Sequence, residues 1–257
     1  MFEPTQSDFP LVTRVSPTWQ FLKTVGSTNQ FLAAYRDQFE DFGLVLTLNQ
    51  TAGRGRKGRE WLSVPGETLA FSILVPQRAS QMETGLLPLI AGTCVLDSLR
   101  EAGVLNAEMK WPNDILVEGR KIAGILCEVI SPTNVSVGVG INLDSTAPSL
   151  PRDFVISLSE CGLVVEEVVD SILARIVELL RVRYANGVAG IEDSVWEEFF
   201  ASRLGTLDRR VHIFEDNDIE WYGRAVGLDR GGHLLVLPDG GEGTRALAAG
   251  DVLHVRG

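Results

Sequence analysis

The chain has 257 residues, of which 45% are hydrophobic and 22% are charged, as in a globular protein with a sizeable core. Its formal net charge of −11 at pH 7 argues against non-specific nucleic-acid binding and against an anionic membrane surface as partner. The N-terminus carries no secretory signal, no apolar run reaches the length of a membrane span, and three scattered cysteines imply no disulfide framework, so we expect a cytoplasmic protein.

The first part of the chain mixes strand and helix patterns. Residues 1–20 are rich in proline and threonine, and we expect an N-terminal arm with one strand there, whereas Ser27 is a helix-capping residue that predicts a helix start. Apolar runs bounded by turn residues predict strands over 44–48, 68–75, 108–111, 115–117, 122–130 and 135–143. Apolar residues at helical spacing predict further helices over 84–102, about 166–184 and about 191–203.

The pattern changes near residue 205. Short segments separated by frequent turns predict a small β-barrel, with strands over 211–214, 219–227, 234–237, 244–247 and 252–255. The chain is therefore predicted to be an α+β protein. Residues 1–205 are expected to form a domain with a mixed β-sheet and flanking helices, and residues 206–257 a smaller all-β domain.

A basic loop stands out in this acidic chain. Residues 53–59 read Gly-Arg-Gly-Arg-Lys-Gly-Arg, so three glycines alternate with four cations. Glycine lets the backbone approach a ligand closely, and arginine offers several donors to a phosphate or carboxylate, so we predict a clamp for a small polyanion. A solvated basic turn is the alternative. The three glycines also match a dinucleotide fingerprint, but residues 60–66 cannot form the helix which that motif must open.

The segment Lys110-Trp111-Pro112-Asn113-Asp114 is the second candidate. Pro112 interrupts the preceding strand, so Asn113 and Asp114 are expected at a bend between two strands. There, a carboxylate beside an amide can hold hydrated Mg²⁺ or hydrogen-bond a ribose or base. A plain turn is the alternative.

Two further strands carry unusual residues. Lys121 enters an apolar strand, where alternation places it on one face with small neighbours; a lysine at a sheet edge is the alternative. Gly138 and Gly140 lie in another strand, where bare backbone suits a flat ligand or a packed neighbouring element. The three histidines lie in the small β-domain without metal-ligand spacing, so a histidine or cysteine metal site is not expected.

Taken together, these segments resemble biotin–protein ligases, also called biotin–[acetyl-CoA-carboxylase] ligases. The resemblance is carried, in the family's order, by residues 26–29, 50–61, 110–114, 121–126 and 138–142. Gly26 is a small departure, because an acidic residue often precedes the Ser-Thr pair. The resemblance implies a class II synthetase-like fold (the biotin–lipoate ligase fold) with an SH3-like C-terminal barrel. It also implies that biotin and ATP, with Mg²⁺, form biotinyl-5′-AMP, from which a lysine of a carboxylase's biotin carboxyl carrier domain receives biotin.

The resemblance also implies roles for single residues. The biotin-binding residues would be Ser27, Thr28, Asn29, Gln50, Arg54, Gly55, Arg56, Lys121, Gly124 and Gly140. The nucleotide-binding residues would be Arg54, Arg56, Arg59, Lys110, Asn113, Asn142 and Trp61, the last stacking on adenine. Catalysis would rest on Lys121, Arg54 and Arg56, and Asp114 would bind Mg²⁺.

Only 26 residues precede Ser27, too few for the winged helix-turn-helix domain of bifunctional members, so we expect a ligase that does not bind DNA. It would be a monomer or a homodimer. A lipoate–protein ligase or octanoyltransferase is the nearest alternative, because it shares the fold, but the arginine-rich loop and the Lys-Trp-Pro-Asn-Asp segment favour biotin. A non-enzymatic nucleic-acid-binding protein is a distant alternative that the acidic charge opposes.

Overall fold

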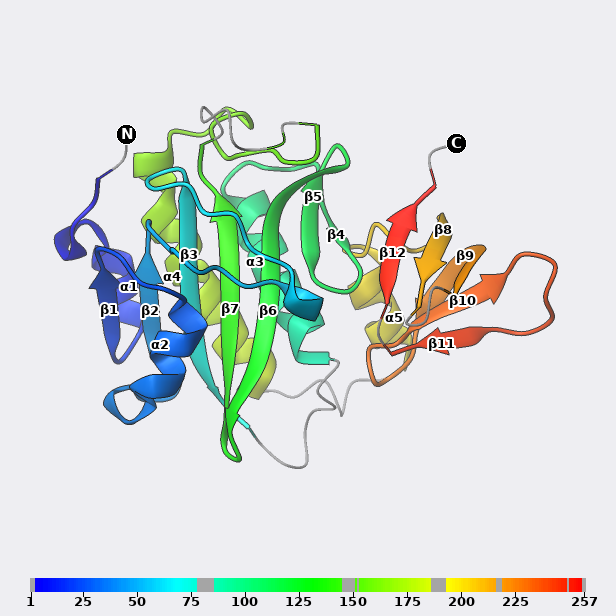
Figure 1. Cartoon of the computed structure of the whole chain (residues 1–257), viewed down its shortest axis with the longest axis horizontal. Helices are drawn as coiled ribbons and strands as arrows, with labels where there is room; N and C mark the ends of the chain where they lie inside the picture. Colours follow the sequence, from blue (N-terminus) through cyan, green and yellow to red (C-terminus); the bar gives the residue numbers. More distant parts are fainter. Residues whose placement is uncertain are drawn as a thin grey trace.

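Two β-sheets organise the chain. The computed structural model describes residues 3–77, 86–144, 151, 153–185, 193–215, 219–248 and 250–255. A seven-stranded sheet has the order β1-β2-β3-β7-β6-β5-β4, and a five-stranded sheet has the order β11-β10-β9-β8-β12 (Figure 1). In the larger sheet β1 and β2 pair in parallel and the other neighbours pair antiparallel, so the predicted α+β class with a mixed sheet is confirmed.

The strands of the larger sheet match the predicted strands, except that β1 lies at the end of the region in which an arm with one strand was expected. They are β1 (Trp19–Leu22), β2 (Leu44–Thr47), β3 (Thr68–Pro76), β4 (Ala107–Lys110), β5 (Asp114–Val117), β6 (Arg120–Ser131) and β7 (Asn134–Asn142). The central strands β3 and β7 are buried along their whole length except for one terminal residue each. Burial on both faces explains why they read as continuous apolar runs rather than as alternating ones.

Helices cover both faces of this sheet. The helices beside it are α1 (Pro10–Val15), α2 (Thr28–Ala34), α3 (Leu86–Glu101) and α4 (Val165–Ala185), whereas α5 (Asp193–Ala201) contacts β9 of the smaller sheet. In Figure 1, α3 and α4 lie behind the sheet and α2 lies in front of it, where it contacts β2, β3, β6 and β7. Ser27 is the N-cap of α2, as predicted, although its side chain makes no capping hydrogen bond. No helix in the described part of the chain is long and apolar enough to cross a membrane.

The prediction of an N-terminal arm is wrong for residues 10–15, which form the helix α1. Its first turn is held from a distance, because the Asp170 carboxylate on α4 accepts hydrogen bonds from the backbone amides of Leu11 at 2.8 Å and Val12 at 3.0 Å. A carboxylate that accepts from free amides at a helix start stabilises that helix. The sequence near residue 10 contains no sign of a partner that lies about 160 positions later.

The five-stranded sheet forms the C-terminal part, as predicted. Its strands are β8 (Arg210–Phe214), β9 (Glu220–Leu228), β10 (Leu234–Pro238), β11 (Arg245–Leu247) and β12 (Asp251–His254). All neighbours pair antiparallel, and the fully buried side chains Val211, Ile213, Ala225, Leu234 and Val236 form its small core. This arrangement is consistent with the SH3-like barrel that the resemblance implies.

Trp111 joins the barrel to the edge of the larger sheet. Its side chain is 2% exposed, and its indole Nε1 donates a hydrogen bond to the carbonyl of Gly232 at 3.0 Å. Its backbone amide donates to Thr206 Oγ1 at 2.9 Å, and this hydroxyl also lies 3.0 Å from His254 Nε2. An isolated β-bridge between Met109 and Leu204 continues the contact. The barrel is therefore fixed beside residues 110–114.

His254 makes this contact sensitive to acid. Burial disfavours the charged imidazolium, and repulsion from Arg209 and Lys110 adds to it, so the pKa of His254 falls from 6.5 to about 4. Because the unfolded chain binds this proton more readily, the stability that neutral His254 provides is complete above pH 6.5 and is lost as the pH falls towards 4. Urea unfolding of the parent between pH 7 and 4 should therefore show a decline that is smaller in His254→Gln. Identical declines in the two proteins would contradict this assignment.

Candidate functional site

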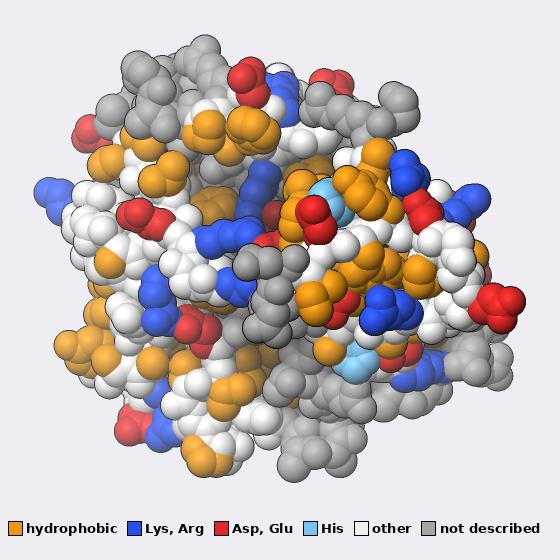
Figure 2. All heavy atoms as spheres, turned by 45° about the vertical axis from the view of Figure 1, so that its right-hand side comes forward, with side chains coloured by type: hydrophobic (Ala, Val, Ile, Leu, Met, Phe, Trp, Pro, Cys, Tyr) orange, Lys and Arg blue, Asp and Glu red, His pale blue; other side chains and the backbone are white. Residues whose placement is uncertain are grey.

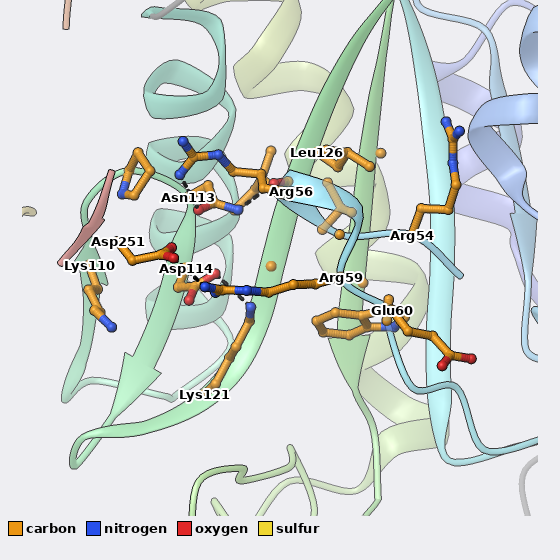
Figure 3. Close-up of a pocket in the computed structure, with 18 of the residues that line it drawn as sticks. Arg54, Arg56, Arg59, Glu60, Lys110, Asn113, Asp114, Lys121, Leu126 and Asp251 are labelled. Carbon is orange, nitrogen blue, oxygen red and sulfur yellow. Dashed lines mark hydrogen bonds and ion pairs between the residues drawn. The ribbon is translucent and has the colours of Figure 1, made fainter. Parts of the chain in front are cut away.

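A cavity of about 450 Å³ lies where the α2 face of the larger sheet meets the barrel. Figure 2 shows Lys and Arg side chains gathered around this hollow, and Figure 3 shows how several of the lining residues lie. The cavity brings together predicted site residues from α2, the basic loop, β4, β5, β6 and β7. These are Ser27, Thr28, Asn29, Gln50, Arg54, Gly55, Arg56, Arg59, Trp61, Lys110, Asn113, Asp114, Lys121, Gly124 and Gly140.

Asn142 is the predicted site residue that does not line the cavity. It is 3% exposed, and its side-chain amide donates to the backbone carbonyls of Lys121 at 3.0 Å and Ile156 at 3.2 Å. Its amide hydrogens are therefore used to hold the start of β6. Asn142 positions the backbone that carries Lys121 and does not face the space where a nucleotide would lie.

Small residues form the floor of the cavity. Ala70 and Ser72 on β3 pair with Gly140 and Gly138 on β7. Because side chains alternate along a strand, Ser136 lies on the same face as the two glycines. A Cβ atom at Gly138 would lie 2.5 Å from Asn29 Oδ1, and one at Gly140 would overlap the indole ring of Trp61. Ser72 and Ser136 were not predicted as site residues, although small residues at every second position of two paired strands were a signal for them.

A buried polar network lies against this floor. Gln50 Oε1 accepts hydrogen bonds from the Thr28 amide at 2.9 Å and from the Thr28 hydroxyl at 3.2 Å. The Ser72 hydroxyl lies 2.8 Å from Thr28 Oγ1 and 2.6 Å from Asn29 Oδ1, which also accepts from Ser136 at 2.8 Å. Buried polar side chains whose orientations are fixed in this way can recognise a ligand with its own donors and acceptors.

Trp61 covers the glycine floor. Its ring lies against Gly124 and Gly140, and the Lys121 ammonium lies 5.4 Å from the ring centroid. The indole Nε1 is buried and has no hydrogen-bond partner among the described residues. A buried donor without a partner is costly, so this nitrogen marks a position where a ligand acceptor would be favourable.

Cations gather at the other end of the cavity. Lys121 Nζ lies 2.6 Å from Asp114 Oδ1, and Lys110 lies nearby (Figure 3). Burial lowers the pKa of Lys110, with repulsion from Lys121 adding to the effect, and burial likewise lowers the pKa of Arg56. When an anion binds beside cations that are partly buried, the electrostatic free energy becomes much more favourable, because water no longer screens the charges. This end of the cavity is therefore suited to a carboxylate or a phosphate.

The basic loop is folded rather than a loose turn. The backbone amide of Gly55 donates to the carbonyl of Arg59 at 2.7 Å, and that of Trp61 donates to Gly53 at 3.1 Å. Arg56 Nη1 lies 3.4 Å from Asn113 Oδ1, and Arg59 forms an ion pair with Asp251. In Figure 3, Arg56 and Arg59 extend towards the residues of β5 and β12, whereas Arg54 points away from them.

The barrel contributes one wall of the cavity, which the sequence analysis did not predict. Phe214, Gly250, Asp251, Val252 and Leu253 line it. Asp251 begins β12 and carries the carboxylate that binds Arg59. The sequence contained no signal for this contact, because the two residues lie 192 positions apart.

Removing the charge of Asp251 should loosen the basic loop without unfolding the barrel. In Asp251→Asn, Arg59 loses its ion pair with β12, so backbone amides over 53–59 should exchange with solvent several-fold faster. Both side chains of the pair are partly exposed, so the free energy of unfolding should change by less than about 1 kcal/mol. Hydrogen–deuterium exchange measured by mass spectrometry tests this. Asp239→Asn, which breaks an exposed pair with Arg210, is the matched control and should leave the loop unchanged.

A resident metal ion does not fit the acidic residues of this site. Among the residues that the structure describes, no group of three or more His, Cys, Asp or Glu side chains could hold a metal ion. Asp114 is paired with Lys121, and Asp251 with Arg59. One or two carboxylates are enough for a Mg²⁺ ion whose remaining ligands are water and substrate phosphates. The site therefore fits a metal that arrives with a nucleotide.

Known proteins are similar to this chain in sequence and in fold. The model of the Biotin/lipoate A/B protein ligase family matches residues 21–142. The biotin--[acetyl-CoA-carboxylase] ligase of Mycobacterium tuberculosis is 34% identical over 249 residues, which cover 93% of this chain and 90% of the relative. The bifunctional ligase/repressor BirA of Bacillus subtilis is 31% identical over 219 residues, covering 81% of this chain, and the match spans 65% of that relative's length.

A solved structure extends the likeness to three dimensions. The biotin protein ligase of Aquifex aeolicus, in complex with biotin and ATP, superposes with a TM-score of 0.76 at 29% identity, and the match covers 94% of this chain and 100% of that one. The mixed sheet of this chain is consistent with that fold, and the match includes most of the chain. The chain therefore belongs to the biotin protein ligase family.

Proposed function

We propose that this chain is an ATP-dependent ligase that activates biotin as biotinyl-5′-AMP and transfers biotin to a lysine on the biotin carboxyl carrier domain of a carboxylase. The observation that carries the proposal is the polarity of the cavity, which has a buried hydrogen-bonding network at one end and partly dehydrated cations at the other. Biotin has the same polarity, with a ureido ring at one end and a carboxylate at the other.

The polar end also distinguishes biotin from lipoate. The dithiolane ring of lipoate has no amide or carbonyl group, so it would leave Thr28 and Gln50 without ligand partners. Sites built to hydrogen-bond a ligand reject analogues that lack its polar groups, because buried donors and acceptors are then unpaired. This argument favours biotin over the lipoate ligase and octanoyltransferase alternatives.

The chemistry proposed is two nucleophilic substitutions. The biotin carboxylate attacks the α-phosphorus of ATP, so a carboxyl–phosphorus bond forms and the bond to pyrophosphate breaks. The lysine amine of the acceptor then attacks the acyl carbon, an amide forms, the amine loses a proton and AMP leaves. Both partners of the first step are anions, so cations beside the reacting atoms lower the barrier. We assign this role to Lys121 and Arg56.

The remaining roles follow the two ends of the cavity. We place the ureido ring at Ser27, Thr28, Asn29 and Gln50, beside the Trp61 ring that covers Gly124 and Gly140. We place the nucleotide at Arg56, Arg59, Lys110 and Asn113, with the ring of Trp61 as the apolar surface for adenine. Asp114, with Asp251 beside it, would hold the Mg²⁺ that neutralises phosphate charge. We further propose residues 1–205 as the catalytic domain, residues 206–257 as the barrel, and the cytoplasm as the location.

The decisive experiment is biotin-dependent exchange of radiolabelled pyrophosphate into ATP. Exchange that requires biotin, and that lipoate does not support, is the expected result. A second assay should then show transfer of labelled biotin to a purified carrier domain and no transfer when its acceptor lysine is replaced. Exchange with lipoate but not with biotin would overturn the proposal.

A further inference from the structure

Glu128 on β6 has no role in the scheme above, although it contacts two of the proposed biotin-binding residues. Its Oε1 accepts a hydrogen bond from the Arg54 guanidinium, and its Oε2 accepts from Asn29 Nδ2 at 2.7 Å. One carboxylate therefore joins the basic loop to helix α2. In the sequence, Glu128 lies 74 positions after Arg54 and 99 positions after Asn29.

The contact with Glu128 helps to orient the side-chain amide of Asn29 within the buried polar network. Asn29 Nδ2 faces two groups that can only accept, the Glu128 carboxylate and the Leu126 carbonyl at 3.2 Å. The amide oxygen must therefore face Ser72 and Ser136, whose hydroxyls donate to it. Glu128, together with the Leu126 carbonyl, therefore fixes the orientation of the Asn29 amide at the polar end of the cavity.

The contact with Arg54 fixes the start of the basic loop. The Arg54 guanidinium points away from Asp114, Lys121 and Asp251 (Figure 3). It forms an ion pair with Glu128. Arg54 was predicted to act in catalysis, but in this position its side chain holds the loop backbone. Arg56 and Arg59 are the arginines of the loop that extend to the cation-rich end.

We propose that Glu128 is a positioning residue that fastens the basic loop to the biotin pocket, acting through Arg54 on the loop and through Asn29 on the pocket. This inference rests on the proposed function, because it assigns the pocket to biotin. Without the carboxylate, Arg54 loses its partner on β6, and the Leu126 carbonyl is the remaining acceptor for the Asn29 amide, which is then held less firmly. Biotin should then bind more weakly, while the groups beside the reacting atoms remain.

A double-mutant cycle separates this role from the alternatives. Since a charge-assisted pair is lost in each case, Glu128→Ala and Arg54→Ala should each lower kcat/KM for biotin by about tenfold. If the two residues act as one unit, the double variant should also lose about tenfold rather than about a hundredfold. Combining Glu128→Ala with Arg56→Ala should instead multiply the two effects, because Arg56 acts elsewhere.

Two readouts identify positioning rather than general damage. The dissociation constant for biotin, measured by isothermal titration calorimetry, should rise by about tenfold in Glu128→Ala, while kcat at saturating biotin stays within about twofold of the parent. Trypsin should also cut within residues 53–59 faster in this variant than in the parent. Glu101→Ala, which breaks a surface pair with Arg175 on the far side of α3, is the control and should change neither value.

The outcomes distinguish this inference from the proposed function. If the parent protein neither binds biotin nor supports exchange, the proposed function is wrong. If the parent is active but Glu128→Ala binds biotin as tightly as the parent, or the cycle with Arg54→Ala is multiplicative, the positioning role is wrong. A loss of kcat with an unchanged biotin dissociation constant would equally overturn it.

Discussion

Replacing Lys121 with alanine should slow biotin-dependent pyrophosphate release by about a hundredfold to a thousandfold, the usual cost of removing one group that stabilises charge in a transition state. Its ammonium lies at the cation-rich end of the cavity, beside Asp114, the Trp61 ring and Gly124. In the proposed reaction two anions come together at this point. Lys121 lies on β6, and the arginines of the basic loop reach the cavity from another element, so they do not replace it and the loss should appear mainly in kcat.

The fold should survive this change. The Lys121–Asp114 pair is partly exposed, and Asp114 keeps its attraction to Lys110 and Arg56, so the free energy of unfolding should fall by less than about 1 kcal/mol. Arg120→Ala is the matched control, since this neighbour pairs with Glu160 outside the cavity. It should retain exchange activity. Parent-like activity in Lys121→Ala would remove Lys121 from the reaction.

Replacing Trp111 with alanine should cause the largest loss of stability, about 3–5 kcal/mol, as for other buried aromatic residues. Trp111 is the largest fully buried side chain in the described part of the protein, and it packs between the larger sheet and the barrel. Its removal leaves a void at that boundary and deprives the Gly232 carbonyl of its donor. We therefore expect both lower stability and faster proteolysis around residues 205–210.

Trp111→Phe separates the contribution of apolar packing from that of the hydrogen bond to the Gly232 carbonyl. Phenylalanine retains most of the apolar packing but cannot donate to Gly232, so the loss should be about 1–3 kcal/mol. Urea unfolding curves of the two variants and the parent provide the comparison. Trp196→Phe, at a buried indole that donates to no described residue, is a control for ring size alone. Equal stabilities of Trp111→Ala and the parent would show that the barrel is held elsewhere.

The sequence predicted the sheets better than it predicted the site. The strands of both sheets could be read because continuous apolar runs end at Gly, Pro and Asn, which are local signals. The helix α1 could not, because Asp170 caps it from a distant helix. Lys121 could be singled out because a lysine enters an apolar strand, whereas neither Glu128 nor Asp251 was predicted to belong to the site. Their importance arises only from which distant side chains they meet.

The ion pairs around the cavity have a consequence for which anions it accepts. Lys121 is already bound to Asp114, and Arg59 to Asp251, so an incoming phosphate gains only the difference between its own attraction and that of a carboxylate. Free inorganic phosphate makes no additional contacts, so it should compete poorly with these carboxylates for the cations. A ligand that also hydrogen-bonds Thr28 and packs a ring against Trp61 gains further binding free energy, with which it can displace the carboxylates. The protein's own acids thus act as a filter that rejects abundant small anions, although the loop sequence resembles a general anion trap.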